Sequence, residues 1–163
     1  MNQHLKTATY KRNILLQWLL LAVGYALSGP LKLLSGLSGR KRSLKKAKIL
    51  ITKEDRVLLV KNTLDPARWT LPGGAMRKME TPQDAVIREL HEELGLHLKL
   101  AGVRHYATLR RQDSNLLYDY EIFTIELIDN VTLKLSLEIL SAQWFKLKNM
   151  PKKTNFIQQI QFD

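Results

Sequence analysis

The chain has 163 residues, of which 45% are hydrophobic and 25% are charged, and it contains no cysteine. This length and composition suit one packed domain with some additional chain, and they exclude wholesale disorder. Because cysteine is absent, the chain forms no disulfide and has neither a thiolate nucleophile nor a cysteine-bound zinc ion.

The formal net charge of +11 is concentrated at one end of the chain. Residues 1–53 contain eleven Lys and Arg and neither Asp nor Glu, whereas residues 54–163 contain fifteen residues of each sign. This distribution predicts a neutral domain behind a basic, apolar leader. It argues against a uniformly basic protein that binds nucleic acid, so nucleic acid is not an expected partner.

The leader contains an apolar run at 14–27 and a basic stretch at 40–48. The run is shorter than the roughly 20 residues that span a bilayer, and its extension to Leu37 includes a proline and a lysine. Three interpretations remain open: a membrane anchor, a cleaved signal peptide, and a helix buried against the domain or a partner. We expect the anchor, with residues 14–48 at a membrane surface and the following domain cytoplasmic; without an anchor, the protein is expected to be cytoplasmic.

The predicted organisation has three parts. Residues 1–39 form a hydrophobic N-terminal segment with a helix, residues 40–46 form a basic linker, and residues 47–163 form the domain. An alternative use of the basic stretch at 40–48 is to bind RNA through charge attraction.

The domain begins with two short apolar runs, 47–52 and 56–61, whose intervening turn is typical of a β-hairpin. A polar loop at 62–68 and a short extended segment at 69–71 follow. Later expected elements are strands within 98–111, 116–128 and 142–146, and a short final helix at 154–161.

A helix is predicted from Thr81 to Leu94. Thr81 can cap it, Pro82 suits its first position and Gly95 is a natural terminator. Its apolar stripe, which is expected to be buried, consists of Val86, Leu90 and Leu94. Strands around one well-capped helix indicate an α/β or α+β domain.

Three carboxylates, Glu89, Glu92 and Glu93, lie on one stripe of this helix at spacings i, i+3 and i+4. Such like-charge neighbours cost about 0.2–0.5 kcal/mol per pair. A solvated acidic face is the ordinary explanation. A hard divalent cation is the other, because Mg²⁺ prefers oxygen ligands and would remove the repulsion.

The spacing of these residues is that of a known family pattern. Gly74, Glu80 and the run 88–96 (Arg-Glu-Leu-His-Glu-Glu-Leu-Gly-Leu) match G-x5-E-x7-R-E-U-x-E-E-x-G-U at every fixed position, where U is a bulky aliphatic residue. The stretch resembles a complete Nudix box, and a looser resemblance extends over about 47–150. The leader lies outside it.

The resemblance implies an α/β fold, namely a Nudix-type α/β/α sandwich with a mixed sheet. It also implies a pyrophosphohydrolase that uses Mg²⁺ or Mn²⁺ and a metal-activated water. The implied substrate is a nucleoside diphosphate linked to another moiety, such as a nucleotide or a sugar nucleotide. The alternative is a Nudix-like regulatory module that binds a nucleotide without turnover. A homodimer is a further expectation from the family.

The same resemblance implies roles for individual residues. Glu89, Glu92 and Glu93 are expected to bind the metal and to be catalytic. Glu80 and Arg88 resemble the family pair that braces the loop of the box against its helix.

Four further positions are less directly indicated. Gly73 and Gly74 are expected at the substrate, since they let the backbone approach it. Glu138 resembles the acidic residue that the family has ahead of its late tryptophan-containing strand, and the resemblance implies a fourth catalytic carboxylate. Arg110 is expected to meet a substrate phosphate. The weaker candidates for the fourth carboxylate are Asp119 and Glu121.

Overall fold

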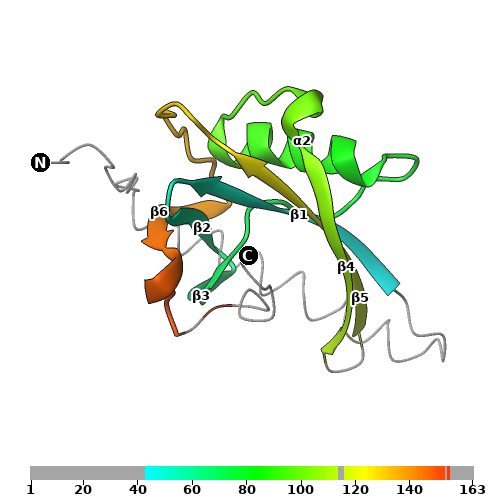
Figure 1. Cartoon of the computed structure of the whole chain (residues 1–163). Helices are drawn as coiled ribbons and strands as arrows, with labels where there is room; N and C mark the ends of the chain where they lie inside the picture. The colour runs from blue at the N-terminus through cyan, green and yellow to red at the C-terminus, as the bar shows by residue number, and fades with distance from the viewer. Residues whose placement is uncertain (1–42, 114–115, 153, 155–163) are drawn as a thin grey trace, which may run out of the picture.

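The structure is a computed structural model that describes residues 43–113, 116–152 and 154 (Figure 1). The strands are β1 (Ser43–Lys53), β2 (Arg56–Asn62), β3 (Asp65–Thr70), β4 (Arg104–Asp113), β5 (Leu116–Glu126) and β6 (Ile139–Lys146). The helical elements are α2 (Pro82–Leu94) and the short 3₁₀ turns η1 (Leu100–Gly102) and η2 (Leu147–Asn149).

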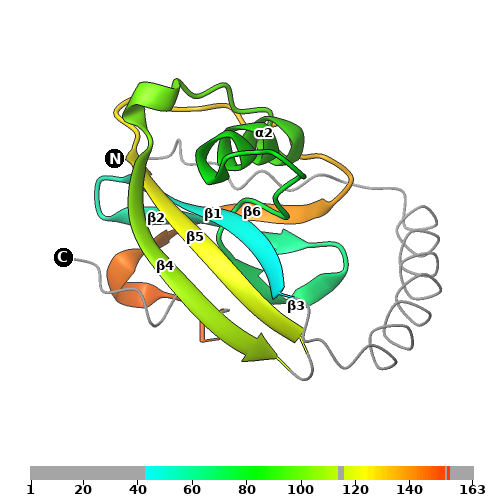
Figure 2. The same ribbon diagram turned by 90° about the vertical axis from the view of Figure 1, so that its right-hand side faces the viewer.

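The strands form one mixed six-stranded sheet. β1 runs parallel to β5 along nearly its whole length, and β5 pairs antiparallel with β4. β1 meets β2 only near their shared turn, at Thr52↔Val57 and Lys53↔Arg56. β2 then leaves β1 and pairs with β3 and β6. Figure 2 shows β1, β5 and β4 side by side, with α2 lying across one face of the sheet.

The side chains of β1 and β2 alternate between two buried layers, as expected for strands with both faces covered. Ile49 and Ile51 of β1 pack with α2 residues on one face. Leu50 packs on the other face with Leu59 of β2 and Ile122 of β5. The two apolar runs of the sequence are therefore strands whose odd and even residues enter different cores.

The expected hairpin of 47–52 and 56–61 is confirmed, with Glu54 in its turn at φ 52°. Two boundaries differ from the expectation. β3 begins inside the expected loop 62–68, because Asn62 pairs with Asp65 across a tight turn. β1 begins at Ser43, inside the expected linker, because it pairs with β5 from that residue onward. The lysines at its start are typical of a solvated segment, so the sequence alone did not indicate a strand there.

The predicted helix is confirmed as α2. The Thr81 side chain accepts a hydrogen bond from Asp84 N at its start, and Gly95 ends it in the left-handed conformation at φ 65°. The face that packs on the sheet consists of Ala85, Val86, Leu90 and Leu94.

The expected α/β fold with a mixed sheet is confirmed. Among the described residues α2 is the single α-helix. The expected leader helix and the expected final helix at 154–161 fall outside the described residues, apart from Thr154, which bridges to Trp69.

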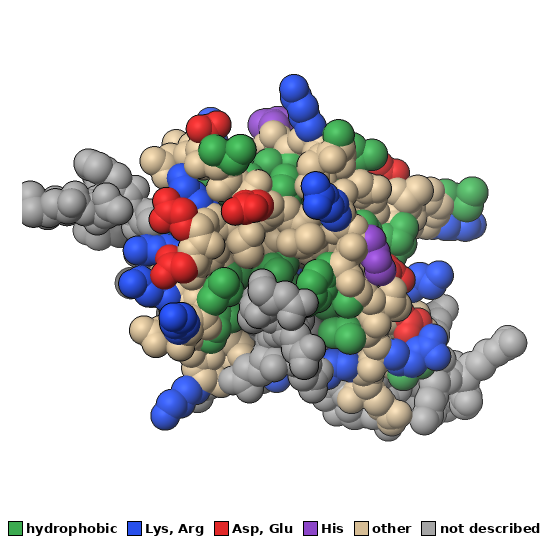
Figure 3. Space-filling view, viewed as in Figure 1, with side chains coloured by type: hydrophobic (Ala, Val, Ile, Leu, Met, Phe, Trp, Pro, Cys, Tyr) green, Lys and Arg blue, Asp and Glu red, His purple; other side chains and the backbone are tan. Residues whose placement is uncertain are grey.

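The expected membrane-associated location needs correction. Within residues 43–113, 116–152 and 154, no helix is long and apolar enough to cross a bilayer. The apolar run at 14–27 lies outside the described residues, and three of the basic residues assigned to its flank, Lys45, Lys46 and Lys48, belong to β1 of the sheet. These three lysines are therefore part of the folded domain and not of a separate basic flank. On the face seen in Figure 3, acidic and basic side chains are interspersed.

Candidate active site

The segment that follows β3 extends the sheet along the edge of β1. Ala47 N donates to Gly74 O at 3.0 Å, Ile49 N donates to Pro72 O at 3.1 Å, and Met76 N donates to Lys45 O at 3.1 Å. These bonds occupy the backbone groups that β1 exposes where it has separated from β2. The loop at 72–76 is therefore held in a fixed position beneath α2.

At two positions of this loop, a side chain larger than that of glycine would clash with neighbouring atoms. Gly73 has φ +110°, and a Cβ there would lie 2.4 Å from Ala47 O. A Cβ on Gly74 would lie 2.6 Å from the carboxylate of Glu89. Gly73 thus permits the approach of the loop to β1, and Gly74 permits the approach of a carboxylate to the loop.

Glu93 joins α2 to this loop. It is a buried carboxylate with 5% of its surface exposed, and its Oε2 accepts a hydrogen bond from Gly73 N at 2.8 Å. Burial raises the pKa of Glu93 to about 7, although the charge of Lys48 and the hydrogen bond from Gly73 oppose the increase. Nearby Glu89 and Glu138 add to the increase.

Lys48 is a functional candidate that the sequence analysis missed. It is a buried lysine of β1, and its Nζ donates to Gly73 O. Burial lowers its pKa, and the charge of Glu93 partly offsets this effect. The sequence did indicate burial of Lys48, because it lies inside an apolar run in which alternate residues enter opposite cores. It was instead grouped with the basic stretch at 40–48.

The expected pair of Glu80 and Arg88 is present. Arg88 Nε donates to Glu80 Oε1 at 2.7 Å and its Nη2 donates to Glu80 Oε2 at 2.9 Å. Nη2 also donates to Ala75 O at 3.1 Å, which fixes the loop against α2. The hydrogen bonds from Arg88 lower the pKa of Glu80 to about 2, and Glu80 in turn raises the pKa of Arg88.

The other two glutamates of the helix also contact Arg88. Its Nη1 donates to Glu89 Oε1 at 2.8 Å and to Glu92 Oε2 at 3.0 Å, while Arg77 Nη2 donates to Glu92 Oε1 at 2.9 Å. Burial acts to raise the pKa of Glu92, but the hydrogen bonds from Arg88 and Arg77 outweigh it and lower the pKa. The Arg88 guanidinium thus bridges Glu89 and Glu92, and Arg77 shares Glu92.

The donor chemistry of Glu89, Glu92 and Glu93 fits a hard divalent cation, because all three supply carboxylate oxygens from one turn of α2. Gly74 leaves open the space beside the Glu89 carboxylate. Among the described residues no three His, Asp or Glu side chains are already grouped as a metal site. A cation would therefore compete with Arg88 for the Glu89 and Glu92 carboxylates.

The remaining expected site residues fall in two places. Glu138 lies just before β6, near enough to Glu93 to influence its pKa. Arg110 lies on β4, 70% exposed and paired with Asp119 at 2.6 Å, in a separate hollow that also includes Glu121. The structure therefore brings Glu138 near Glu93 and leaves Arg110, Asp119 and Glu121 in a separate hollow.

This combination of fold and site is that of a Nudix protein. The family model described as the NUDIX domain matches residues 44–162. The chain belongs to the Nudix hydrolase family, which confirms the resemblance carried by the box. The expectation of a hydrolase is supported at the level of the family.

Several named proteins are similar to this chain. Human diphosphoinositol polyphosphate phosphohydrolases 3-alpha and 3-beta are each 32% identical over 100 residues, which cover 61% of this chain and 60% of theirs. The match thus spans about three fifths of each relative. A MutT NUDIX hydrolase from Burkholderia pseudomallei has the same fold, with a TM-score of 0.65 at 22% identity over 73% of this chain and 95% of that one.

A further solved structure shares the fold. It is a bifunctional NMN adenylyltransferase/ADP ribose pyrophosphatase from Francisella tularensis, complexed with AMP and a manganese ion. Its TM-score is 0.59 at 23% identity, and the match covers 71% of this chain and 37% of that one.

Proposed function

We propose that this protein is a pyrophosphohydrolase that cleaves a phosphoric anhydride bond with the help of Mg²⁺ or Mn²⁺. The proposed substrate class is a nucleoside diphosphate linked to another moiety. The observation that carries the proposal is the contact between α2 and the glycine loop, in which Gly73 N binds Glu93 and Gly74 leaves room for Glu89.

In this proposal each residue has a defined task. Glu89, Glu92 and Glu93 hold the cation, which when bound neutralises phosphate oxygens and lowers the pKa of a coordinated water. Glu138, close to Glu93, is the proposed acceptor of the proton from the attacking water. Arg88 keeps the loop and the helix in register through Ala75 O.

A second substrate class is favoured by the relatives. Those that are 32% identical bear the name diphosphoinositol polyphosphate phosphohydrolase. Such a substrate contains the same type of anhydride bond, so the same carboxylates would serve it. We therefore include 5-diphosphoinositol pentakisphosphate among the candidate substrates.

The test is an initial-rate assay of the full chain with Mg²⁺, with Mn²⁺ and with EDTA. The substrates are ADP-ribose, sugar nucleotides, dinucleotides and 5-diphosphoinositol pentakisphosphate, and the readout is phosphate or nucleoside monophosphate release. We expect turnover that EDTA abolishes and that Glu92→Gln lowers about 100-fold or more, since a charged group acting on the transition state is lost. Glu126→Gln, which removes an exposed carboxylate of β5, is the matched control and retains full activity.

Two results would contradict the proposal. One is the absence of turnover for every substrate and metal, and the other is a Glu92→Gln variant as active as the unmodified chain. Tight nucleotide binding without turnover would select the regulatory module instead.

A further inference from the structure

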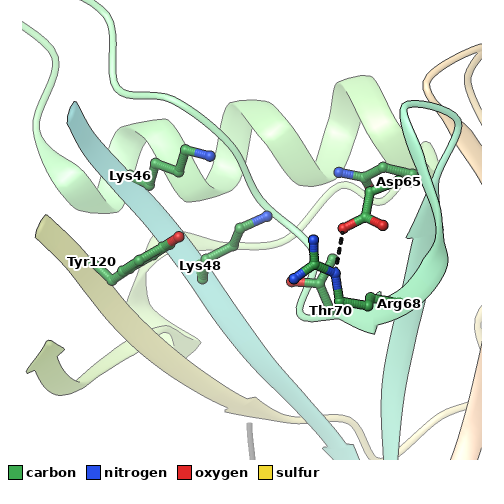
Figure 4. Close-up of a pocket in the computed structure, with 7 residues that line it drawn as sticks. Lys46, Lys48, Asp65, Arg68, Thr70 and Tyr120 are labelled. Atoms are coloured by element: carbon green, nitrogen blue, oxygen red, sulfur yellow. Dashed lines mark hydrogen bonds and ion pairs between the residues drawn. The ribbon is translucent and has the colours of Figure 1, made fainter. Parts of the chain in front are cut away.

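A cavity of about 160 Å³ lies where β1 and β2 have separated, away from their shared turn (Figure 4). Side chains from four strands line it. They are Lys46 and Lys48 of β1, Asn62 of β2, Asp65, Arg68 and Thr70 of β3, and Tyr120 of β5. Figure 4 shows Lys46, Lys48 and Tyr120 reaching toward Arg68 and Thr70 from the opposite wall.

The lining is strongly cationic. Three cationic side chains and one carboxylate line the cavity, and outside the lining the carboxylate of Glu93 acts on Lys48. Asp65 is engaged by Arg68 Nε at 3.0 Å. Lys46 Nζ lies 4.8 Å from the centroid of the Tyr118 ring, and within the described part of the chain it forms no ion pair with a carboxylate. Concentrated positive charge between strands is unfavourable unless an anion balances it.

Two buried polar groups at this cavity have unused hydrogen-bonding capacity. Lys48 is 6% exposed, and its Nζ donates to Gly73 O, which leaves two of its three N–H groups for other acceptors. Asn62 Oδ1 is buried and accepts no hydrogen bond from any described residue. Buried polar groups are normally satisfied. A ligand that satisfies both must present anionic acceptors to the lysines and a donor, such as a hydroxyl, to Asn62.

The cavity is connected to Glu93 through Lys48 and the backbone of Gly73. Lys48 Nζ binds the carbonyl oxygen of Gly73, and the N–H of the same residue binds Glu93. A molecule whose anhydride bond lies at Glu93 would therefore extend its next group toward Lys48. Tyr120 is the single aromatic residue of the lining, so the cavity offers little surface on which a nucleobase would stack.

We propose that this cavity binds a phosphate group of the substrate other than the scissile diphosphate, and that the substrate is therefore a phosphorylated, hydroxyl-bearing compound. Lys46, Lys48 and Arg68 would donate to the phosphate, and Asn62 would accept from a hydroxyl. The location of the scissile bond in this inference rests on the function proposed above. The binding of the second phosphate rests on the cavity itself.

The test measures binding of inositol hexakisphosphate to the full chain by calorimetry. This probe carries phosphates on a polyol and has no anhydride bond, so turnover does not enter. We expect Lys46→Gln and Arg68→Gln each to weaken the affinity about tenfold, whereas Arg68→Lys, which keeps the charge, stays within about threefold. Lys99→Gln, which removes an exposed charge at the start of η1, is the matched control and leaves the affinity unchanged.

Thermal melting of each free variant verifies that it is folded. The inference is overturned if the unmodified chain does not bind the probe, or if the Gln variants at 46 and 68 bind as tightly as Lys99→Gln does. If both Gln variants lose affinity but the unmodified chain shows no hydrolytic activity, the proposed function is overturned and the anion-binding cavity is supported. Hydrolysis together with unchanged affinity would overturn this inference alone.

Discussion

Gly73 N donates a 2.8 Å hydrogen bond to Oε2 of Glu93, across twenty positions of the sequence. The carbonyl oxygen of the same glycine accepts a hydrogen bond from Lys48 Nζ. One residue of the loop is thus bound on one side by the acidic helix and on the other by the first strand. This arrangement couples the geometry of the carboxylates to the backbone of the loop.

The two glycines of the loop should respond differently to substitution by alanine. In Gly73→Ala the new Cβ meets the backbone oxygen of Ala47 at 2.4 Å and φ is +110°, so we expect the free energy of unfolding to fall by about 3 kcal/mol. In Gly74→Ala the atoms nearest to the new Cβ belong to the side-chain carboxylate of Glu89, so we expect a loss below about 1 kcal/mol and a decrease in kcat of at least about tenfold.

Urea unfolding and initial rates measured on the same preparations separate the two effects. If Gly74→Ala retained full activity, Glu89 would not need its present position against the loop. If Gly73→Ala were as stable as the unmodified chain, the loop would not be held as closely to β1 as described.

The pair of Glu80 and Arg88 predicts a specific dependence of stability on pH. The pKa of Glu80 is lowered from 4.5 to about 2 in the folded state, so the pair stabilises the fold above pH 4.5 and this contribution is lost as pH falls toward 2. We expect Glu80→Gln to be about 2 kcal/mol less stable than the unmodified chain at pH 7. The difference between them should shrink between pH 4.5 and pH 2.

Urea unfolding at a series of pH values checks this prediction. Glu126→Gln is the control, because its carboxylate is exposed on β5. Equal stability differences at pH 7 and pH 2 would show that the ionisation of Glu80 is not what supports the loop.

Divalent cations should stabilise the folded chain, because they relieve the repulsion between the carboxylates of α2. At a Mg²⁺ concentration ten times its dissociation constant, we expect about 1.4 kcal/mol of stabilisation and an increase in Tm of several degrees. Glu89→Gln should reduce this increase, whereas Glu126→Gln should not. NaCl at equal ionic strength controls for screening, and an increase of the same size with NaCl would contradict the prediction.

The parts of the fold that depend on local sequence were predictable. Thr81, Pro82 and Gly95 mark both ends of α2 within one stretch of chain, and the structure has the helix at those bounds. The spacing of Glu80 and Arg88 likewise belongs to the box, and the pair is present. These features required no knowledge of distant strands.

The parts that depend on long-range pairing were not predictable. Ser43 begins a strand because β5, more than seventy positions later in the chain, lies beside it. Lys48 looks like one member of a basic stretch until the sheet buries it against Gly73. Arg110 was expected to meet a substrate phosphate, but it pairs with Asp119 of the neighbouring strand and lies away from the glutamates of α2.

A crystal structure of the full chain, grown with MnCl₂ and a non-hydrolysable analogue such as α,β-methylene-ADP, tests the central claim most directly. Anomalous scattering locates manganese without reference to the protein coordinates. We expect an anomalous peak within coordinating distance of the carboxylates of Glu89, Glu92 and Glu93, with the diphosphate analogue beside it. Saturating manganese with no peak at these three side chains, which would remain bound to Arg88 and Gly73, would contradict it.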